Sequence, residues 1–337
     1  MPHVLHENRP FAEWTGTACL VTGGLGFIGC NLVRALVDGG ARVRVVDALV
    51  PGHGGRADHL DGVDVDKVVV ASIADPDVAD LIDGVDVVFN VAGQVSHSAS
   101  MRDPQQDLQL NATSHATLLD TIRRVQPAAR VIYTSTRQVY GRSTMSTVDE
   151  THAASPVDVN GVAKLAGEQL HLVYAHAYGL ASCALRLTNV YGPRQRLTSD
   201  DLGFLPVFMR KALSGEEILI YGDGTQRRDC LHVDDVVAAI ATATDDRAVG
   251  QVFNVGHPSS YTVAEIAERI ARVAGSEGGV RLVDWPDEQA RIDIGSFHTG
   301  SARIGEALGW RASIDLDEGV LDTVEFYREH PWYLSST

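Results

Sequence analysis

The feature that most constrains the fold is a glycine-rich segment, VTGGLGFIG, which joins an apolar run to a segment with helical periodicity. Its glycines Gly23, Gly26 and Gly29 are spaced three residues apart. Glycine permits the tight turn, the close approach of a pyrophosphate to the backbone, and the packing of a helix on a strand. The start of that helix also offers free amide donors. The segment therefore predicts a dinucleotide-binding turn.

Apolar runs rich in β-branched residues alternate with helix-period segments along most of the chain. We expect strands at 18–23, 41–47, 67–72, 86–93, 130–136, 182–190 and 251–256, and helices at 27–40, 111–125, 159–179, 202–215 and 261–275. Alternation of this kind predicts a parallel sheet with helices on both faces. Thr262 is the expected N-cap of the last of these helices.

We therefore predict an α/β fold, a doubly wound parallel sheet of the Rossmann type with a smaller C-terminal lobe for the substrate. The expected cofactor domain comprises residues 12–188 and 228–256. The expected substrate lobe comprises residues 189–227 and 257–330, whose later segments are punctuated by proline and glycine.

Composition narrows the possible partners and the compartment. The chain has 28 Lys and Arg against 44 Asp and Glu, a net charge of −16, which argues against a nucleic-acid partner. None of the four cysteines forms a C-x-x-C pair, and the 13 histidines show no H-E-x-x-H spacing, so we expect buried free thiols and no metal. No apolar run approaches the roughly 18 residues of a membrane span, and no signal-peptide pattern is present. We therefore expect a cytoplasmic protein without a membrane partner.

Asp47 ends the second expected strand, 18 residues after Gly29. A carboxylate at this place can accept hydrogen bonds from both hydroxyls of the adenosine ribose, and it would repel a 2′-phosphate. This predicts NAD rather than NADP as the cofactor. Arg42 and Arg44 on the same strand weaken the exclusion of NADP, and an ordinary aspartate at a strand end is the alternative interpretation.

The strand expected at 130–136 ends with Thr134 and Thr136 on one face, because side chains alternate along a strand. The carboxyl end of a parallel strand is where such sheets bind ligands. We therefore expect Thr136 to donate a hydrogen bond to a substrate oxygen. Lys164, on the next helix, could reach the nicotinamide ribose.

In these segments the chain resembles the extended short-chain dehydrogenase/reductases that act on nucleotide sugars. The resemblance runs from about residue 16 to about residue 325 and rests on the order of VTGGLGFIG, Asp47, NVAG, YTSTRQVYG, P-x-x-x-N-G-x-x-K, LRLTNVYGP, YGDGTQRRDCLHVDD, FNVG and LGW. It implies a tightly bound NAD that takes a hydride from the sugar and returns it. It also implies a homodimer built by the helices at 111–125 and 159–179, although Leu165, Leu172 and Val173 are equally explained by core packing.

The resemblance also implies roles for individual residues. The expected cofactor contacts are Gly23, Gly26, Phe27, Ile28, Gly29, Asp47, Ser72, Ile73, Ala92, Gly93 and Lys164. Ser72 departs from the family, which carries an aspartate there. The expected substrate contacts are Ser100, Asn189, Arg228 and Arg291. The two arginines would clamp the substrate diphosphate, since guanidinium forks suit that group; a solvated surface charge is the alternative for either one.

Asn160 occupies the position where the family carries its catalytic tyrosine. The tyrosine hydroxyl moves the proton when C–OH and C=O interconvert, and an amide has no useful acid or base at pH 7. His97 is one candidate replacement, because imidazole titrates near neutrality; a surface-loop histidine is the alternative interpretation. Lys164, acting through a water or a ribose hydroxyl, is the second candidate.

Arg137 is another departure, because relatives carry a small residue or, in dehydratases, an acid directly after Thr136. The 4,6-dehydratases that the chain resembles need an Asp–Glu pair there. The run Thr136-Arg137-Gln138 supplies neither acid, which disfavours a standard 4,6-dehydratase. Three roles remain open for Arg137: it could stabilise a developing oxyanion, bind a sugar carboxylate, or be an outward-pointing structural arginine.

The leading functional hypothesis is an NAD-dependent epimerase of a nucleoside-diphosphate sugar, because epimerisation needs only transient oxidation, reorientation of the ketone and return of the hydride. Thr136 would polarise the reacting oxygen, Asn160 would position it and Lys164 would anchor the ribose, with His97 or solvent handling the proton. The alternatives are a non-standard dehydratase or decarboxylase, and a catalytically dead protein that binds NAD and a sugar nucleotide. Retention of Thr136, Lys164 and the arginines argues against the dead protein.

Overall fold

The chain builds one large parallel sheet at its core. The computed structural model describes residues 14–198, 201 and 203–334, so residues 12–13 of the expected cofactor domain and Leu202 of the expected helix lie outside the described residues. The strands are β1 (Ala18–Thr22), β2 (Arg42–Asp47), β3 (Lys67–Val70), β4 (Val87–Asn90), β5 (Arg130–Thr136), β6 (Ala181–Leu187) and β11 (Val252–Val255). They pair in parallel in the order β11-β6-β5-β4-β1-β2-β3. The order reverses between β1 and β4, which is the switch point of a doubly wound sheet.

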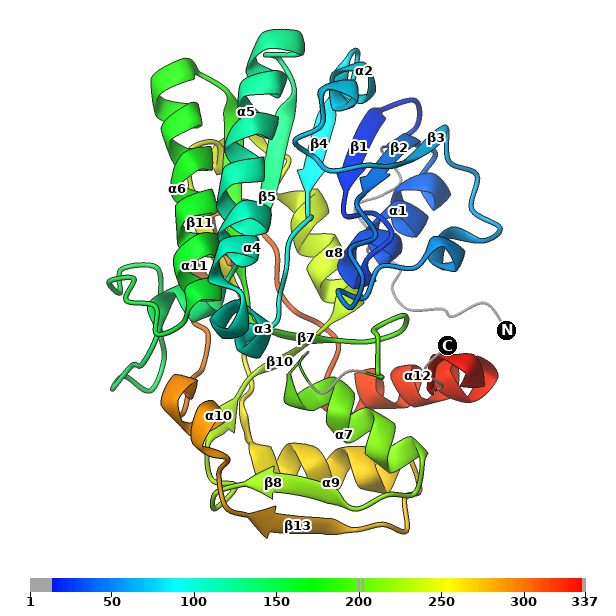
Figure 1. Cartoon of the computed structure of the whole chain (residues 1–337), viewed down its shortest axis with the longest axis vertical. Helices are drawn as coiled ribbons and strands as arrows, with labels where there is room; N and C mark the ends of the chain where they lie inside the picture. Colours follow the sequence, from blue (N-terminus) through cyan, green and yellow to red (C-terminus); the bar gives the residue numbers. More distant parts are fainter. Residues whose placement is uncertain (1–13, 199–200, 202, 335–337) are drawn as a thin grey trace.

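Helices cover both faces of this sheet, as the sequence predicts (Figure 1). The helices of this part are α1 (Phe27–Asp38), α2 (Ala79–Ile82), α3 (His97–Arg102), α4 (Pro104–Leu108), α5 (Ser114–Val125), α6 (Val159–Tyr178), α8 (Val233–Thr242) and α11 (Ala302–Leu308). Val21 faces α1 and α8, whereas its neighbour Leu20 faces α2 and α5. Burial of both faces explains why the strands are continuous apolar runs. The predicted Rossmann fold is confirmed.

The smaller lobe lies below the sheet in Figure 1, under α3 and the short strand pair β7 (Asn189–Tyr191) and β10 (Cys230–His232). Its elements are α7 (Phe204–Leu213), β8 (Ile218–Tyr221), β9 (Arg227–Arg228), β12 (Tyr261–Thr262), α9 (Val263–Val273), β13 (Val280–Val283), α10 (Asp287–Ile292) and α12 (Leu316–Glu329). An apolar core of its own joins α7, α9 and α12. Three residues from late in the chain instead pack with the core of the sheet domain: Ile304, Leu308 and Trp310.

Most expected boundaries agree with the structure to within a few residues, and two differ in kind. The strand expected at 182–190 is two strands, because the chain leaves the main sheet after Leu187 and β7 pairs with β10 instead. The helix expected at 111–125 begins at Ser114 and is preceded by a π-helical turn, Gln109–Thr113. Thr262 is the N-cap of α9 and forms a capping box with Glu265, as predicted.

All four cysteines are buried free thiols, as predicted. No helix within the described ranges is long and apolar enough to cross a membrane.

Candidate active site

The glycine-rich turn connects β1 to α1 at the carboxyl edge of the sheet. Gly23 has a φ of +68°, and a Cβ atom there would lie 2.7 Å from the Cα atom of Ala92. A Cβ atom on Gly29 would lie 2.0 Å from the carbonyl oxygen of Gly23. Gly26 caps α1 without a side chain, and Phe27 and Ile28 form the first turn. The turn thus has the close-packed backbone that a bound pyrophosphate requires, so these residues fit a dinucleotide.

Asp47 joins the end of β2 to this turn. Its carboxylate accepts hydrogen bonds from the backbone amides of Leu25 at 3.0 Å and Leu49 at 2.8 Å. Burial raises the pKa of Asp47, and these backbone hydrogen bonds oppose the rise. At the end of the neighbouring β3, Ile73 is buried and the Ser72 hydroxyl accepts a hydrogen bond from the amide of Ala74. The residues expected to meet the adenosine therefore lie along the ends of adjacent strands.

Lys164 reaches from α6 towards the end of β5. Its side chain is buried, and Nζ donates to the carbonyl oxygen of Thr134 over 3.2 Å. Burial lowers the pKa of Lys164 to about 8, and the charge of Asp107 acts in the opposite direction. A Cβ atom on Gly93 would lie 2.7 Å from Nζ, so glycine is what allows the backbone after β4 to pass this amine. Thr136 is half-buried at the end of β5, and its oxygen accepts from the amide of Gln138 at 3.2 Å.

Asn160 is turned into a buried polar network. Its Nδ2 atom donates to the carbonyl oxygen of Gln94 at 2.9 Å and to Oδ1 of Asp107 at 3.2 Å. Its backbone amide donates to the Ser100 hydroxyl at 3.1 Å, and that hydroxyl donates to the carbonyl oxygen of His97 at 2.7 Å. Ser100, expected on the substrate side, is fully buried here. Asn160 and Ser100 therefore tie α6 to α3 and to the loop after β4.

Asp107 is a member of this network that sequence reasoning missed. Its carboxylate is buried and accepts from the side-chain amides of Asn160 and Asn111, each at 3.2 Å. Burial raises the pKa of Asp107, while these two hydrogen bonds and the charge of Lys164 lower it. Asn111 lies on the π-helical turn, and its side chain exchanges two hydrogen bonds of 3.0 Å with the backbone of Gln94. Asp107 lies four residues before Asn111, and side chains at this spacing on a helix can meet, so the spacing could have predicted their contact.

His97 lies beside a second carboxylate that sequence reasoning missed. Its Nδ1 atom is 2.9 Å from Oδ2 of Asp158. Asp158 is the N-cap of α6 and accepts from the Gly161 amide at 2.7 Å and from the Gln138 side chain at 3.0 Å. Burial alone would raise the pKa of Asp158, but hydrogen bonding and the charge of His97 bring it below its usual value. An aspartate two residues before Asn160, at the start of a predicted helix, was a recognisable cap.

The arginines lie between the sheet and the smaller lobe. Nη2 of Arg137 donates to Oδ1 of Asn189 at 2.8 Å, and its guanidinium carbon is 5.3 Å from the ring centre of Phe297. Arg228 is buried, donates to the carbonyl oxygen of Gly295 and has Nη2 3.2 Å from Oδ1 of Asp293.

Arg291, the other expected clamp residue, lies on α10 with an exposed side chain. Arg228 is close enough to Arg137 for its charge, together with burial, to lower the pKa of Arg137 to about 10. The structure thus brings Arg228 together with Arg137, a pairing that spacing along the chain does not suggest.

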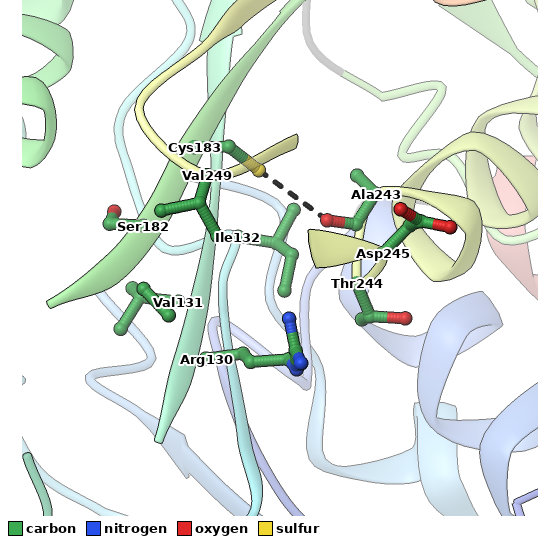
Figure 2. A pocket seen from close by; sticks show the side chains of 10 residues that line it. Arg130, Val131, Ile132, Ser182, Cys183, Ala243, Thr244, Asp245 and Val249 are labelled. Atoms are coloured by element: carbon green, nitrogen blue, oxygen red, sulfur yellow. Dashed lines mark hydrogen bonds between the residues drawn. The ribbon is translucent and has the colours of Figure 1, made fainter. Parts of the chain in front are cut away.

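The pocket in Figure 2 lies elsewhere, at the amino ends of β5 and β6. Arg130 and Ser182 line it together with Ala243, which accepts a hydrogen bond from the Cys183 thiol at 3.6 Å. None of the predicted site residues lines this pocket. Within the part of the chain that the structure describes, no three His, Cys, Asp or Glu side chains are grouped as metal ligands.

Comparison with known proteins identifies the family to which the chain belongs. Residues 19–256 match the model of the NAD dependent epimerase/dehydratase family. The UDP-glucose 4-epimerase of Mycolicibacterium smegmatis is 32% identical over 314 residues, covering 92% of this chain and 98% of that protein.

Two solved structures are also similar. The Thermotoga maritima UDP-glucose 4-epimerase, solved with UDP-glucose, has 31% identity and a TM-score of 0.86, covering 94% of this chain and 100% of that one. The Streptomyces venezuelae dTDP-glucose 4,6-dehydratase, solved with NAD, has 27% identity and a TM-score of 0.84, covering 95% of this chain and 100% of that one. The chain belongs to the NAD-dependent epimerase/dehydratase family and takes NAD as its cofactor.

Proposed function

We propose that this chain epimerises a nucleoside-diphosphate sugar by transient oxidation of one carbinol, with His97 moving the proton. Bound NAD supplies the acceptor and donor of the hydride. The observation that carries the proposal is the 2.9 Å separation between Nδ1 of His97 and the buried carboxylate of Asp158. Thr136 and Lys164 match the family, whereas Asn160 stands where the family carries its tyrosine, so the site needs another group that carries the proton.

The Asp158 carboxylate suits a role in orienting an imidazole base. It is buried, and the Gly161 amide and the Gln138 side chain hold it in place. Its lowered pKa keeps it ionised at neutral pH. A carboxylate beside Nδ1 favours the tautomer with a proton on that nitrogen, which leaves the lone pair of Nε2 as the base. The His97 side chain is 35% exposed, so a ligand can reach the ring.

The other residues would hold the reactants. The Thr136 oxygen accepts the hydrogen bond from Gln138, which leaves its hydroxyl hydrogen for a substrate oxygen. Lys164, with its pKa near 8, is mainly cationic at neutral pH and would donate to the nicotinamide ribose. Asn160 would act by bracing Gln94 and Asp107 rather than by proton transfer.

The two alternative reactions, dehydration and decarboxylation, require different residues directly after Thr136. A standard 4,6-dehydratase needs two acids there, whereas the chain has Arg137 and a glutamine whose amide is bound to Asp158. A decarboxylase needs a substrate carboxylate, for which the cation of Arg137 would be suitable. Deuterium distinguishes these reactions, because enolisation exchanges a carbon-bound proton and simple 4-epimerisation does not.

The experiment begins with release and identification of the nucleotide that co-purifies with the protein. A panel of UDP-, GDP-, CDP- and dTDP-sugars is then followed by NMR in D₂O. We expect an epimer without deuterium at the neighbouring carbon. Uptake with loss of water or carbon dioxide would replace the proposal with a dehydratase or a decarboxylase, and tight binding without conversion would indicate a binding protein.

The role of His97 is tested by His97→Gln, whose amide keeps a polar group beside Asp158 but cannot titrate. General acid–base catalysis contributes about 10²- to 10⁴-fold, so kcat should fall within that range. The matched control is His152→Gln, since His152 also faces a carboxylate, Asp149, at 3.2 Å but lies outside the site. A nearly normal rate in His97→Gln would leave Lys164 as the candidate.

We also propose a homodimer formed by the outer surfaces of α5 and α6, which lie side by side in Figure 1. Val162 and Val173 on α6 are 48% and 51% exposed and are eleven residues apart, which places them on one side of the helix. Leu165 instead packs against buried apolar residues of the protein. Light scattering after size-exclusion chromatography should give twice the chain mass, and Val173→Glu should reduce it to one chain.

A further inference from the structure

We propose that Arg137 binds a carboxylate on the sugar, so that the substrate class is a nucleoside-diphosphate uronic acid. This inference rests on the proposed function only in taking a sugar nucleotide as the ligand. It concerns recognition by the side chain that directly follows Thr136, the residue expected at the reacting oxygen.

The first observation is that part of the Arg137 guanidinium is buried without a partner. Nη2 is bound to Asn189, but Nη1 is buried and has no hydrogen-bond acceptor among the described residues. A buried donor without an acceptor is costly, and more so when the group is charged. An incoming anionic oxygen would satisfy this nitrogen.

The second observation is that the acids near Arg137 have other partners. Asp293 forms an ion pair with Arg228, and Oδ1 of Asp229 accepts from the amide and the hydroxyl of Thr299, each at 3.2 Å. The charges of both acids favour the cation of Arg137, yet burial and Arg228 outweigh them and its pKa falls to about 10. Among the described residues, neither acid therefore forms a direct ion pair with Arg137.

The third observation is the geometry of the guanidinium. Asn189 holds Nη2, and the ring of Phe297 lies 5.3 Å from the guanidinium carbon. These contacts from two separate segments orient the plane before any ligand arrives. A planar, fixed guanidinium matches a planar carboxylate better than it matches a neutral hydroxymethyl group. Arg228 differs, because it already donates to backbone carbonyl oxygens and to Asp293.

The test compares two pairs of ligands, each of which differs only at the sugar C6 position, and uses UDP as the ligand without a sugar. Binding of UDP-glucose, UDP-glucuronic acid, dTDP-glucose, dTDP-glucuronic acid and UDP is measured by calorimetry on the NAD-loaded protein and on Arg137→Met. We expect the wild type to bind the glucuronic acid forms 10- to 100-fold more tightly than the glucose forms. In Arg137→Met this ratio should fall to about one, with binding of UDP and of the glucose forms retained.

Two further variants test whether the change in the affinity ratio is specific to the Arg137 guanidinium. Arg137→Lys retains the charge without the fork and should give an intermediate ratio, which also covers the case in which Arg137→Met does not fold. Arg281→Met is the control, because Arg281 is an exposed arginine in an ion pair with Glu217 at 2.8 Å, and it should leave the ratio unchanged. UDP-glucuronic acid should also raise the melting temperature of the wild type more than that of Arg137→Met.

Four results would overturn the inference. The first is no preference for the glucuronic acid forms in the wild type, and the second is an unchanged preference in Arg137→Met. The third is an equal loss for all ligands including UDP in Arg137→Met, which would assign Arg137 to the diphosphate. Absence of binding by every probe would also reject it. Because calorimetry compares the affinities of the ligands whether or not the sugar is converted, its result is separate from that of the reaction test. Conversion of UDP-glucose without a preference would reject the inference alone, and tight binding of UDP-glucuronic acid without conversion would reject the proposed epimerase alone.

Discussion

The side-chain amide of Asn160 donates a hydrogen bond to the carboxylate of Asp107 over 3.2 Å, and both side chains are buried. The same amide group donates to the carbonyl oxygen of Gln94. A tyrosine has one hydroxyl donor at the end of a longer side chain, so it could not make this pair of contacts. The buried contacts between α6, the loop after β4 and α4 therefore depend on the amide group of Asn160.

Replacement of Asn160 should consequently destabilise the protein. Asn160→Ala removes donors from a buried carboxylate and a buried carbonyl, and we expect the free energy of unfolding to fall by about 1–3 kcal/mol. Asn160→Tyr should also be less stable, with no gain in turnover. Urea unfolding measures the change, and Gln105→Ala, which removes an exposed amide on α4, should stay within about 0.5 kcal/mol of the wild type. A steep rise in activity for Asn160→Tyr would contradict this view.

Asp47 should control both the glycine-rich turn and the choice of cofactor. Asp47→Asn keeps an acceptor for only one of the amides of Leu25 and Leu49, which bond to different carboxylate oxygens, and it removes the charge that repels a 2′-phosphate. We expect the preference for NAD over NADP to fall at least about tenfold, which is about 1.4 kcal/mol. Asp47→Ala should also lower the melting temperature, since two backbone donors lose their acceptor. Calorimetric titration with both cofactors measures the preference, and an unchanged ratio in Asp47→Asn would refute the assignment.

Lys164 should make stability depend on pH in the alkaline range. Its pKa is about 8 in the folded protein against an ordinary value of 10.5, so between these values the unfolded chain binds more protons and stability rises with pH. We expect the wild type to gain about 3 kcal/mol relative to Lys164→Met between pH 8 and pH 10.5. Urea unfolding at several pH values tests this, with Lys67→Met on the exposed side of β3 as the control that should show no such trend. If the difference in the free energy of unfolding between the wild type and Lys164→Met does not change with pH, the pKa of Lys164 is not lowered in the folded protein.

The buried ion pair between α6 and β6 should be costly to break. Arg186 donates to both carboxylate oxygens of Glu168, at 2.9 and 2.6 Å, and to the Tyr140 hydroxyl at 2.7 Å. Glu168→Gln leaves the buried guanidinium without a counter-charge, and we expect a loss of about 3–5 kcal/mol in the free energy of unfolding. Glu217→Gln breaks the exposed pair with Arg281 and should cost no more than about 1 kcal/mol. Equal losses in the two variants would show that burial does not set the cost.

Much of the fold follows from residues that are close together in the sequence. The glycine spacing, the alternation of apolar strands with helices, and the Thr262 cap are local patterns, and each predicts its element because φ, ψ and side-chain direction depend on near neighbours. The carboxyl ends of parallel strands share one edge of the sheet, so the same patterns also predict that Gly23, Asp47 and Thr136 lie along it.

The sequence by itself therefore determined the doubly wound sheet, the glycine-rich turn and the edge of the sheet at which the proposed site lies. Only the tertiary structure decided which polar groups meet there: His97 with Asp158, Asn160 with Asp107, and Arg137 with Asn189. These partners come from separate segments, and periodicity specifies the face of an element but not the neighbour that packs against it. The physical reason is that a buried polar atom takes its partner from the packing of the whole chain, which no local pattern contains.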